Sequence, residues 1–388
     1  MVKTILRTKL QVSLLLAVAV MSTGVLTACG TNSSNNNSNG NASGSLKSTT
    51  LIVPDGAPLL SVASLVEGGA LNSSSGVFQV GDDVSKELGA KVGIQVVQDS
   101  DTLVANIKKE RPELAVVPIN LAAKLYNENA TNKESQYRLL GVSTWGLNQV
   151  VANFNISSLK DLVGKKLYSF AKSGVPGITI RALLKKEGIA YADFKDTVSA
   201  TAVNIVDFTA APDIVAELPK NLYEQHVALL SEPVASAFEI KTQGKYFSKL
   251  DLQVLIAQAF NGLKYPQAGL VVRSDILDDA SCADFLNKFT ASIAKTAPAL
   301  KENAEQVVVR TKENFKSAAL ASTAAVVSAL KGGRLDVEFV PVFDQHKSGE
   351  EKIKQDVKAL LQIIQDSGAS ALIGGKVPDD KFFALDKN

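Results

Sequence analysis

The first residues that could do chemistry lie in a loop just after a β-branched apolar run at 51–53. Glycine at the loop's centre allows a ligand to approach the backbone closely. The apolar residues at 59–67 predict a helix whose positive N-terminus, with unpaired N–H groups, would point at the same place. A proline and glycine turn chosen only for its shape is the alternative. The loop residues that we predict to contact a ligand are Asp55, Gly56, Ala57 and Pro58.

A second small-residue loop, at 171–177, precedes a helix predicted over 178–187. Such a loop could hold an anionic or polar head group at the helix N-terminus, with hydroxyl groups as further donors. It lacks the lysine pattern of nucleotide-binding loops, so a nucleoside triphosphate is not indicated. The residues predicted to bind here are Ser173, Gly174, Val175 and Thr179.

Three single residues extend this candidate ligand-binding set. Asn120 follows a predicted strand at 114–118 and offers both a donor and an acceptor. Trp145, the single tryptophan, could stack on a planar or cationic ligand, although such a residue is more often part of a core. Glu232 could meet a cationic group or cap the following helix.

Catalytic and metal chemistry find little support in the sequence. His226 and His346 are the only histidines, and neither has a second ligand at metal-binding spacing. The Gly-x-Ser-x-Gly, His-Glu-x-x-His and Gly-x-Gly-x-x-Gly motifs are missing. We therefore expect neither an enzyme, nor a metal site, nor a cofactor.

The N-terminus has the layout of an export signal. Basic residues at 3, 7 and 9 precede an apolar run at 12–21 that is too short to span a bilayer comfortably. The sequence Leu-Thr-Ala-Cys that ends at Cys29 resembles the bacterial lipobox, in which the cysteine receives a lipid before cleavage. We predict a lipoprotein signal peptide over residues 1–28 and a membrane lipid on Cys29 at the extracytoplasmic face.

The next segment, 29–50, is almost entirely Asn, Ser, Gly and Thr, which predicts a disordered tether. The signal contains three of the 41 basic residues and no acid, so the remaining chain is close to neutral, with 38 basic and 39 acidic residues. Near neutrality without a basic run argues against a nucleic-acid partner. Cys282, the other cysteine, is interpreted as a small packed hydrophobic residue, and its role stays open.

From residue 51 onward, apolar strands alternate with helices, which predicts α/β architecture with parallel-rich sheets. The length favours two lobes. Expected strands include 93–97, 166–170, 203–208 and 227–230, and one long strand at 139–151. Helices alone follow from residue 282, at 283–294, 301–307, 315–331 and 351–366. We assign 51–150 to lobe one, 151–268 to lobe two, and 269–388 to the return strand and C-terminal helices of lobe one.

Four segments, taken in order, resemble the type II periplasmic-binding-protein fold, specifically the nitrate, sulfonate, taurine and thiamine-precursor group of ABC-importer solute-binding proteins. They are the strand-to-helix segment 115–126, the DLVGKKL motif at 161–167, the Glu-Pro turn within 228–236, and the return strand 269–274. The resemblance covers most of the chain after the tether and departs from the family at the Gly/Ser-rich residues 68–84. It implies two lobes hinged near Val150 and Gly269 that close over a small-molecule solute without covalent chemistry.

The resemblance also implies an ABC permease as partner, and we expect a monomer. Helix N-termini at the two loops favour a small organic anion or a nitrogen heterocycle as the ligand. A lipoprotein that senses its ligand for a signalling system is the alternative, and an enzyme on the same fold is less favoured. The sequence leaves open the ligand's identity, the choice between transporter and sensor, and the Gram type of the host.

Overall fold

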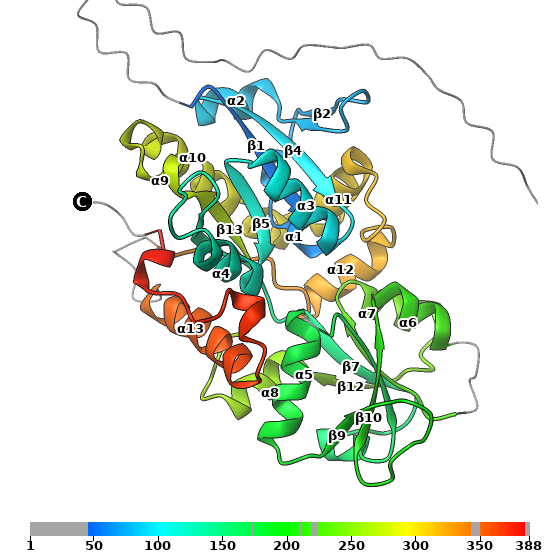
Figure 1. Cartoon of the computed structure of the whole chain (residues 1–388). Coiled ribbons are helices and arrows are strands. Elements are labelled where there is room, and N and C mark those ends of the chain that lie inside the picture. The colour runs from blue at the N-terminus through cyan, green and yellow to red at the C-terminus, as the bar shows by residue number, and fades with distance from the viewer. Residues whose placement is uncertain (1–45, 173, 210, 219–223, 343–349, 385–388) are drawn as a thin grey trace, which may run out of the picture. The chain divides into compact units, whose positions relative to one another are not determined.

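The computed structural model describes residues 46–172, 174–209, 211–218, 224–342 and 350–384 (Figure 1). The predicted signal peptide, Cys29, most of the predicted tether, Ser173 and His346 lie outside these ranges. Strands in the described residues form two mixed sheets. The predicted α/β fold class is therefore confirmed.

The first sheet has a parallel centre, in which β1 pairs with β4 on one side and β5 on the other. β13 returns antiparallel between β5 and β6. In spatial order the strands are β14 (Val340–Pro341), β6 (Tyr137–Trp145), β13 (Pro266–Arg273), β5 (Leu114–Pro118), β1 (Ser48–Pro54), β4 (Lys91–Val97), β3 (Phe78–Gln79) and β2 (Ala70–Leu71).

Helices cover both faces of this sheet. On one face, α3 and α4 bury apolar residues against the strands, and on the other face α1, a 3₁₀ turn at Ala63–Leu65, α10 and α11 do so (Figure 1). The carboxylate of Asp99 caps α3 by accepting from Thr102 N at 2.8 Å, which lowers the pKa of Asp99. The helices are α1 (Ala57–Leu60), α2 (Asp82–Leu88), α3 (Ser100–Glu110), α4 (Ile119–Glu128), α9 (Ser274–Asp278), α10 (Ala283–Ala294) and α11 (Thr296–Phe315).

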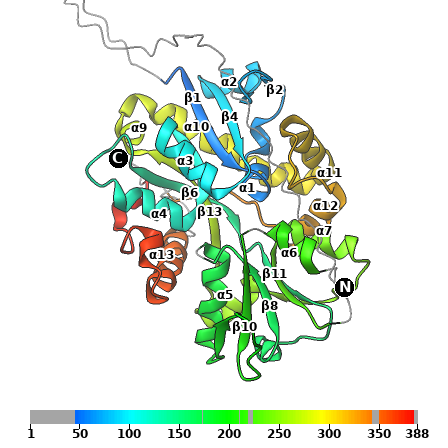
Figure 2. The same ribbon diagram turned by 45° about the vertical axis from the view of Figure 1, so that its right-hand side comes forward.

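The second sheet is built from one continuous stretch of chain. Its spatial order is β12 (Ser248–Asp251), β7 (Asn148–Ala152), β11 (Val227–Ser231), β8 (Lys166–Phe170), β10 (Val203–Phe208) and β9 (Tyr191–Asp193). One face packs on α5 and α8, and the other on α6 and α7 (Figure 2). These helices are α5 (Val175–Lys186), α6 (Ala211–Glu217), α7 (Val234–Lys241) and α8 (Leu252–Ala259). A 3₁₀ turn, Leu159–Leu162, precedes β8.

Two short segments, here called the crossing segments, connect the sheets. They are residues 146–147, between β6 and β7, and residues 260–265, between α8 and β13. The single strand predicted over 139–151 is wrong, because the chain breaks between Trp145 and Asn148 and the two halves join different sheets. Gly146 makes this break with φ +47°, and a Cβ there would lie 2.7 Å from Gln253 Oε1. The predicted lobe boundary at residue 150 thus falls inside β7.

Other sequence-based boundaries also shift. β1 begins at Ser48, so the last three residues of the predicted tether belong to a strand. The C-terminal helices are α10, α11, α12 (Thr323–Lys331) and α13 (Glu350–Asp366), so the helices predicted at 301–307 and 315–331 are replaced by a longer α11 and a shorter α12. α12 contacts α7, and α13 contacts α5, so both helices also touch the second sheet's helices. Two more 3₁₀ turns, Ser370–Ile373 and Asp380–Phe382, follow α13.

Cys282 ends a 3₁₀ turn, Ala280–Cys282, and is buried, and burial raises the pKa of its thiol. Within the described residues, no helix is both long and apolar enough to cross a membrane.

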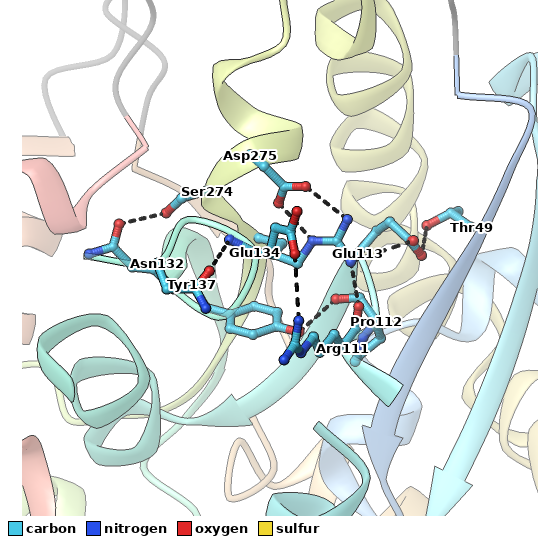
Figure 3. A network of polar contacts seen from close by, with 11 residues as sticks. Thr49, Arg111, Pro112, Glu113, Asn132, Glu134, Tyr137, Ser274 and Asp275 are labelled. Carbon is cyan, nitrogen blue, oxygen red and sulfur yellow. Dashed lines mark hydrogen bonds and ion pairs between the residues drawn. The ribbon is translucent and has the colours of Figure 1, made fainter. Parts of the chain in front are cut away.

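At the amino ends of β1 and β5, polar side chains form a network that stays within the first sheet (Figure 3). Arg273 makes a two-pronged ion pair with Asp275, at 2.7 and 2.9 Å, and its Nη1 donates to Arg111 O at 2.6 Å. Tyr137 Oη donates to Pro112 O at 2.7 Å, and Thr49 Oγ1 donates to Glu113 Oε2 at 3.2 Å. This network fastens the end of β13 to its neighbours. Burial raises the pKa of Tyr137.

Candidate functional site

The carboxyl ends of β5 and β8 both lead into helices with uncapped first turns. α4 starts after Pro118 and α5 starts after Gly174, and neither helix has a side-chain hydrogen bond at its cap. Among the described residues, no side chain accepts a hydrogen bond from the first backbone N–H groups of either helix, and helix N-termini of this kind bind anions and polar groups. Asn120 is the second residue of α4, and its buried Oδ1 has no hydrogen-bond partner in the described chain.

The loop before α5 is folded tightly against its own helix. Ala171 has φ +50°, and a Cβ on Gly177 would lie 2.5 Å from Ala171 O and 2.8 Å from Lys172 Cα. Glycine at 177 thus allows the loop backbone to lie directly on the first helical turn. Gly174 is the N-cap and Val175 is the first helical residue, so α5 starts three residues earlier than the helix predicted over 178–187 and includes part of the predicted loop.

Basic residues beside this loop are already paired. Lys172 Nζ forms an ion pair with Asp193, and Arg181 Nη2 lies 2.6 Å from Asp207 and 3.1 Å from Asp193. The hydrogen bond from Lys172 is the main cause that lowers the pKa of Asp193. These ion pairs hold the loop to β9 and β10. Because the two cations already have acidic partners, the uncapped N–H groups of α5 are the main groups with which the loop could attract an anion.

Thr179 belongs to a buried chain of hydrogen bonds around the crossing segments. Its Oγ1 donates to Val175 O at 2.7 Å and lies 2.9 Å from Tyr265 Oη, to which Asn148 Nδ2 donates at 3.4 Å. Because the Thr179 proton is used on Val175, the Tyr265 hydroxyl is the donor to Thr179. Burial raises the pKa of Tyr265. The chain connects α5 to the beginnings of β7 and β13.

Trp145 is in the core beside the crossing segments. Its side chain is 1% exposed, its Nε1 donates to Glu338 O at 2.9 Å, and Lys264 Nζ lies 4.0 Å from its ring centroid. The stacking face predicted for a ligand is thus in contact with a side chain of this protein. The contacts of Trp145 therefore favour a role in the core.

Glu232 likewise has internal partners for its carboxylate, which is 1% exposed. It accepts from Ser236 N at 3.0 Å and Ser236 Oγ at 3.1 Å, and Arg334 Nε lies 3.1 Å away. The capping alternative therefore describes its contacts, with an ion pair in addition. Glu232 N donates to Leu147 O at 2.7 Å, which places the residue beside the first crossing segment.

The first predicted loop differs from expectation in its helix. The helix predicted over 59–67 is wrong: α1 covers only Ala57–Leu60, and a 3₁₀ turn follows. Asp55 accepts hydrogen bonds from Gly56 N at 2.7 Å, from Ser317 Oγ, and from Ala319 N at 3.2 Å. Its carboxylate thus joins the loop to the chain after α11. Gly56, Ala57 and half-buried Pro58 begin the short helix without a strong helix terminus.

Three of the described candidates lie beside the crossing segments. Trp145 directly precedes the first segment, Glu232 N donates to Leu147 O of that segment, and Thr179 contacts Tyr265 of the second. Sequence reasoning missed Asn148, Tyr265 and Arg334. Asn148 and Gln149 begin a strand whose other residues are apolar, which was a usable signal, since a buried amide needs partners. Two surface hollows, of about 510 and 190 Å³, are lined by residues of α11 to α13 and the C-terminal segment, and include none of the candidates.

No protein-family profile and no curated protein matches the chain. Solved structures do match it. An ABC transporter protein from Parabacteroides distasonis shares 17% identity, with a TM-score of 0.61 over 87% of this chain and 98% of that one. The periplasmic aliphatic sulphonate binding protein SsuA from Escherichia coli shares 12% identity, with a TM-score of 0.56 over 86% and 90% of the two chains.

The chain has the periplasmic-binding-protein fold. The alkanesulfonate-binding protein SsuA from Xanthomonas axonopodis pv. citri, solved with MOPS bound, is similar in the same way, at 12% identity and a TM-score of 0.52 over 88% and 98% of the two chains. These neighbours include the group that the sequence resembles. In a periplasmic-binding-protein fold the carboxyl ends of the strands face the ligand, which is where α4 and α5 start here.

Proposed function

We propose that this chain is the solute-binding component of an ABC importer, held at the extracytoplasmic face of the membrane by lipid on Cys29. It captures a small organic anion or a nitrogen heterocycle between its two lobes, with residues 51–150 and 269–388 in lobe one and 151–268 in lobe two. The supporting observation is the pair of uncapped helices, α4 and α5, that start beside the crossing segments of a periplasmic-binding-protein fold.

In this proposal, different parts of the site bind different parts of the ligand. The N-termini of α4 and α5 supply backbone donors for a polar or anionic group, and Asn120 Oδ1 supplies an acceptor. Ser173, Gly174 and Val175 form the loop side of the site, with Thr179 behind them, and Asp55 to Pro58 form the opposite side. Closing the lobes expels water and strengthens each hydrogen bond, so the ligand stabilises the closed state that a permease reads.

A thermal-shift screen of the full chain tests the ligand class, with alkyl sulfonates, nitrate, pyrimidines and amino acids as probes. A ligand at a hundred times its Kd stabilises the folded state by about 2.7 kcal/mol, which raises Tm measurably. Asn120→Ala should abolish the shift, while Asn129→Ala, at the other end of α4, should retain it. A shift with oligosaccharides but with none of these probes contradicts the proposed ligand class.

Anchoring is tested separately in the bacterial cell. Cells fed an alkyne-tagged fatty acid should label the wild-type protein and leave a Cys29→Ser variant unlabelled and released from the membrane fraction. Equal labelling of a variant that retains only Cys29 and lacks Cys282 assigns the lipid to Cys29. Label that persists in Cys29→Ser contradicts the lipoprotein assignment.

A further inference from the structure

A seven-residue segment after α12 contacts the first sheet, the start of α7 beside the second sheet, and Lys264 of the second crossing segment. This segment, residues 334–340, is here called the strap. It starts two glycines after α12, where Arg334 N donates to Ala329 O at 2.9 Å, and ends at β14, where Val340 pairs with Val142 of β6. Its contacts change along its length from the second sheet's helices to the first sheet's edge.

The beginning of the strap binds the second sheet's side. Arg334 Nε lies 3.1 Å from Glu232 Oε1, and Nη2 donates to Ser236 Oγ at 3.1 Å and to Ser328 Oγ at 3.4 Å. The Glu232 side chain is 1% exposed and that of Arg334 is 24% exposed, so the pair is largely removed from water. Arg334 is the one cationic partner of Glu232 among the described residues, and a buried carboxylate that loses such a partner is strongly disfavoured, which makes this attachment specific.

The middle of the strap contacts the last residue of β6 and one residue of the second crossing segment. Asp336 O accepts from Trp145 N at 3.0 Å, and Asp336 Oδ2 lies 3.2 Å from Lys264 Nζ. Glu338 O accepts from Trp145 Nε1 at 2.9 Å, and Lys264 lies over the same indole ring. Trp145 adjoins one crossing segment, and Lys264 is part of the other. The strap therefore joins the end of β6, where the first crossing segment begins, to the second crossing segment.

The end of the strap packs closely on the first sheet. A Cβ on Gly141 would lie 2.6 Å from the Phe339 ring and 2.6 Å from Val340 O. Glycine in β6 thus leaves the space into which the strap fits. Phe339 itself is 6% exposed and belongs to the first sheet's core.

We propose that the strap sets the angle between the two lobes, with Arg334 and Asp336 as positioning residues for the ligand site. Because none of its contacts requires a ligand, the strap holds the lobes near one arrangement before binding, which lowers the ordering entropy that the ligand must overcome. This consequence for affinity rests on the proposed function. The positioning role itself is tested without any ligand.

The test compares two arginine variants of the full chain, each of which removes a guanidinium from a carboxylate. Arg334→Met removes the strap's first attachment, and Arg273→Met removes a pair at the opposite end of the first sheet. Trp145 is the single tryptophan, so the protein has one indole N–H signal and one indole emission. The readouts are the exchange rate of that N–H, the emission maximum, and the radius of gyration from small-angle scattering.

We expect Arg334→Met to speed indole exchange at least about tenfold, to shift the emission to the red and to enlarge the radius of gyration. Arg334→Lys, which keeps the charge, should restore part of each change. Arg273→Met should leave the emission maximum and the radius of gyration unchanged, and should speed indole exchange by no more than its loss of global stability accounts for. Identical readouts for Arg334→Met and wild type overturn the proposal, and so does an equal response to Arg273→Met. If Arg334→Met does not fold, Arg334→Lys and Gly141→Ala provide the same three readouts, and wild-type values in both overturn it.

These readouts also separate the two proposals. If no probe shifts Tm but the strap variants respond as expected, the ligand assignment fails and the strap's role stands. If probes bind and the strap variants behave as wild type, the ligand assignment stands and the strap's role fails.

Discussion

The two ends of the first sheet use charge differently. At the amino ends of β1 and β5, Arg273 pairs with Asp275 on the residues that follow its own strand, and the network includes only parts of the first sheet and its loops. At the carboxyl ends, Arg334 pairs with Glu232 of the second sheet's side, and Lys264 pairs with Asp336 across the crossing segments. Ion pairs within one sheet can stabilise it, whereas pairs across sheets can also fix their relative position.

The largest expected effects come from the two ends of β6, which carry Tyr137 and Trp145, each 1% exposed. Trp145→Ala and Tyr137→Ala should each lower the free energy of unfolding by about 3–5 kcal/mol, measured by urea denaturation with circular dichroism. Only Trp145→Ala should also enlarge the radius of gyration, because only that side chain contacts the strap. An equal enlargement in both variants would remove the distinction between the two ends.

Arg273→Met should have the next largest effect. Its guanidinium makes two bonds to Asp275 and one to Arg111 O, and losing charged hydrogen bonds costs about 1.5–3 kcal/mol of folding free energy. Urea denaturation measures this loss, and thermal shifts with a bound probe should keep the same size relative to the variant's own Tm. A selective loss of probe binding would show that this end also shapes the ligand site.

Tyr265→Phe should have a smaller effect, about 0.5–1.5 kcal/mol, because it removes one hydroxyl from the buried chain between Asn148 and Thr179. Thr179 keeps its bond to Val175 O, so α5 stays folded. Denaturation gives the stability, and the probe titration gives the affinity. Tyr137→Phe, which removes the hydroxyl bonded to Pro112 O, is the matched control at the other end and should leave the affinity unchanged.

The smallest effect concerns pH and the loop before α5. The pKa of Asp193 is lowered chiefly by its hydrogen bond from Lys172, so the pair stabilises the fold above the ordinary carboxyl pKa of about 3.9 and loses that contribution as pH falls through the lowered value. A carbon-13 titration of the Asp193 carboxyl measures this. Lys172→Met should move the midpoint up toward the ordinary value, and an unchanged midpoint would show that Lys172 is not the cause.

Strand positions were the most predictable part of the fold. The bounds predicted at 114–118, 166–170 and 203–208 coincide with β5, β8 and β10. β5 and β10 contain β-branched apolar residues, which favour buried strands, whereas β8 shows the alternating burial of a strand. The helix predicted at 59–67 failed because its residues are buried on nearly every side, so packing decides its path. Ser61 Oγ also donates to Pro58 O at 2.7 Å, a local bond that competes with helix continuation.

The candidate site was only partly predictable. The uncapped starts of α4 and α5 follow from local sequence, since proline and glycine there supply no capping side chain. The contacts of Trp145 with Glu338 and of Glu232 with Arg334 do not follow from local sequence, because both partners belong to the strap, roughly a hundred or more positions later in the chain. A partner that is so distant along the chain leaves no periodic pattern in the sequence. A core residue therefore cannot be told from a ligand-binding residue by sequence alone.

The strand order has a consequence for how the protein forms. Every strand of the second sheet lies between residues 148 and 251, so that sheet can assemble as soon as this one stretch has emerged. The first sheet needs β13 to join β5 to β6, and β14 to complete its edge, so it must wait for almost the whole chain. We expect the second sheet, formed by residues 148–251, to fold before the first sheet, although β1 precedes it in the chain. The edges of β1 should therefore stay unpaired and accessible to chaperones for longest.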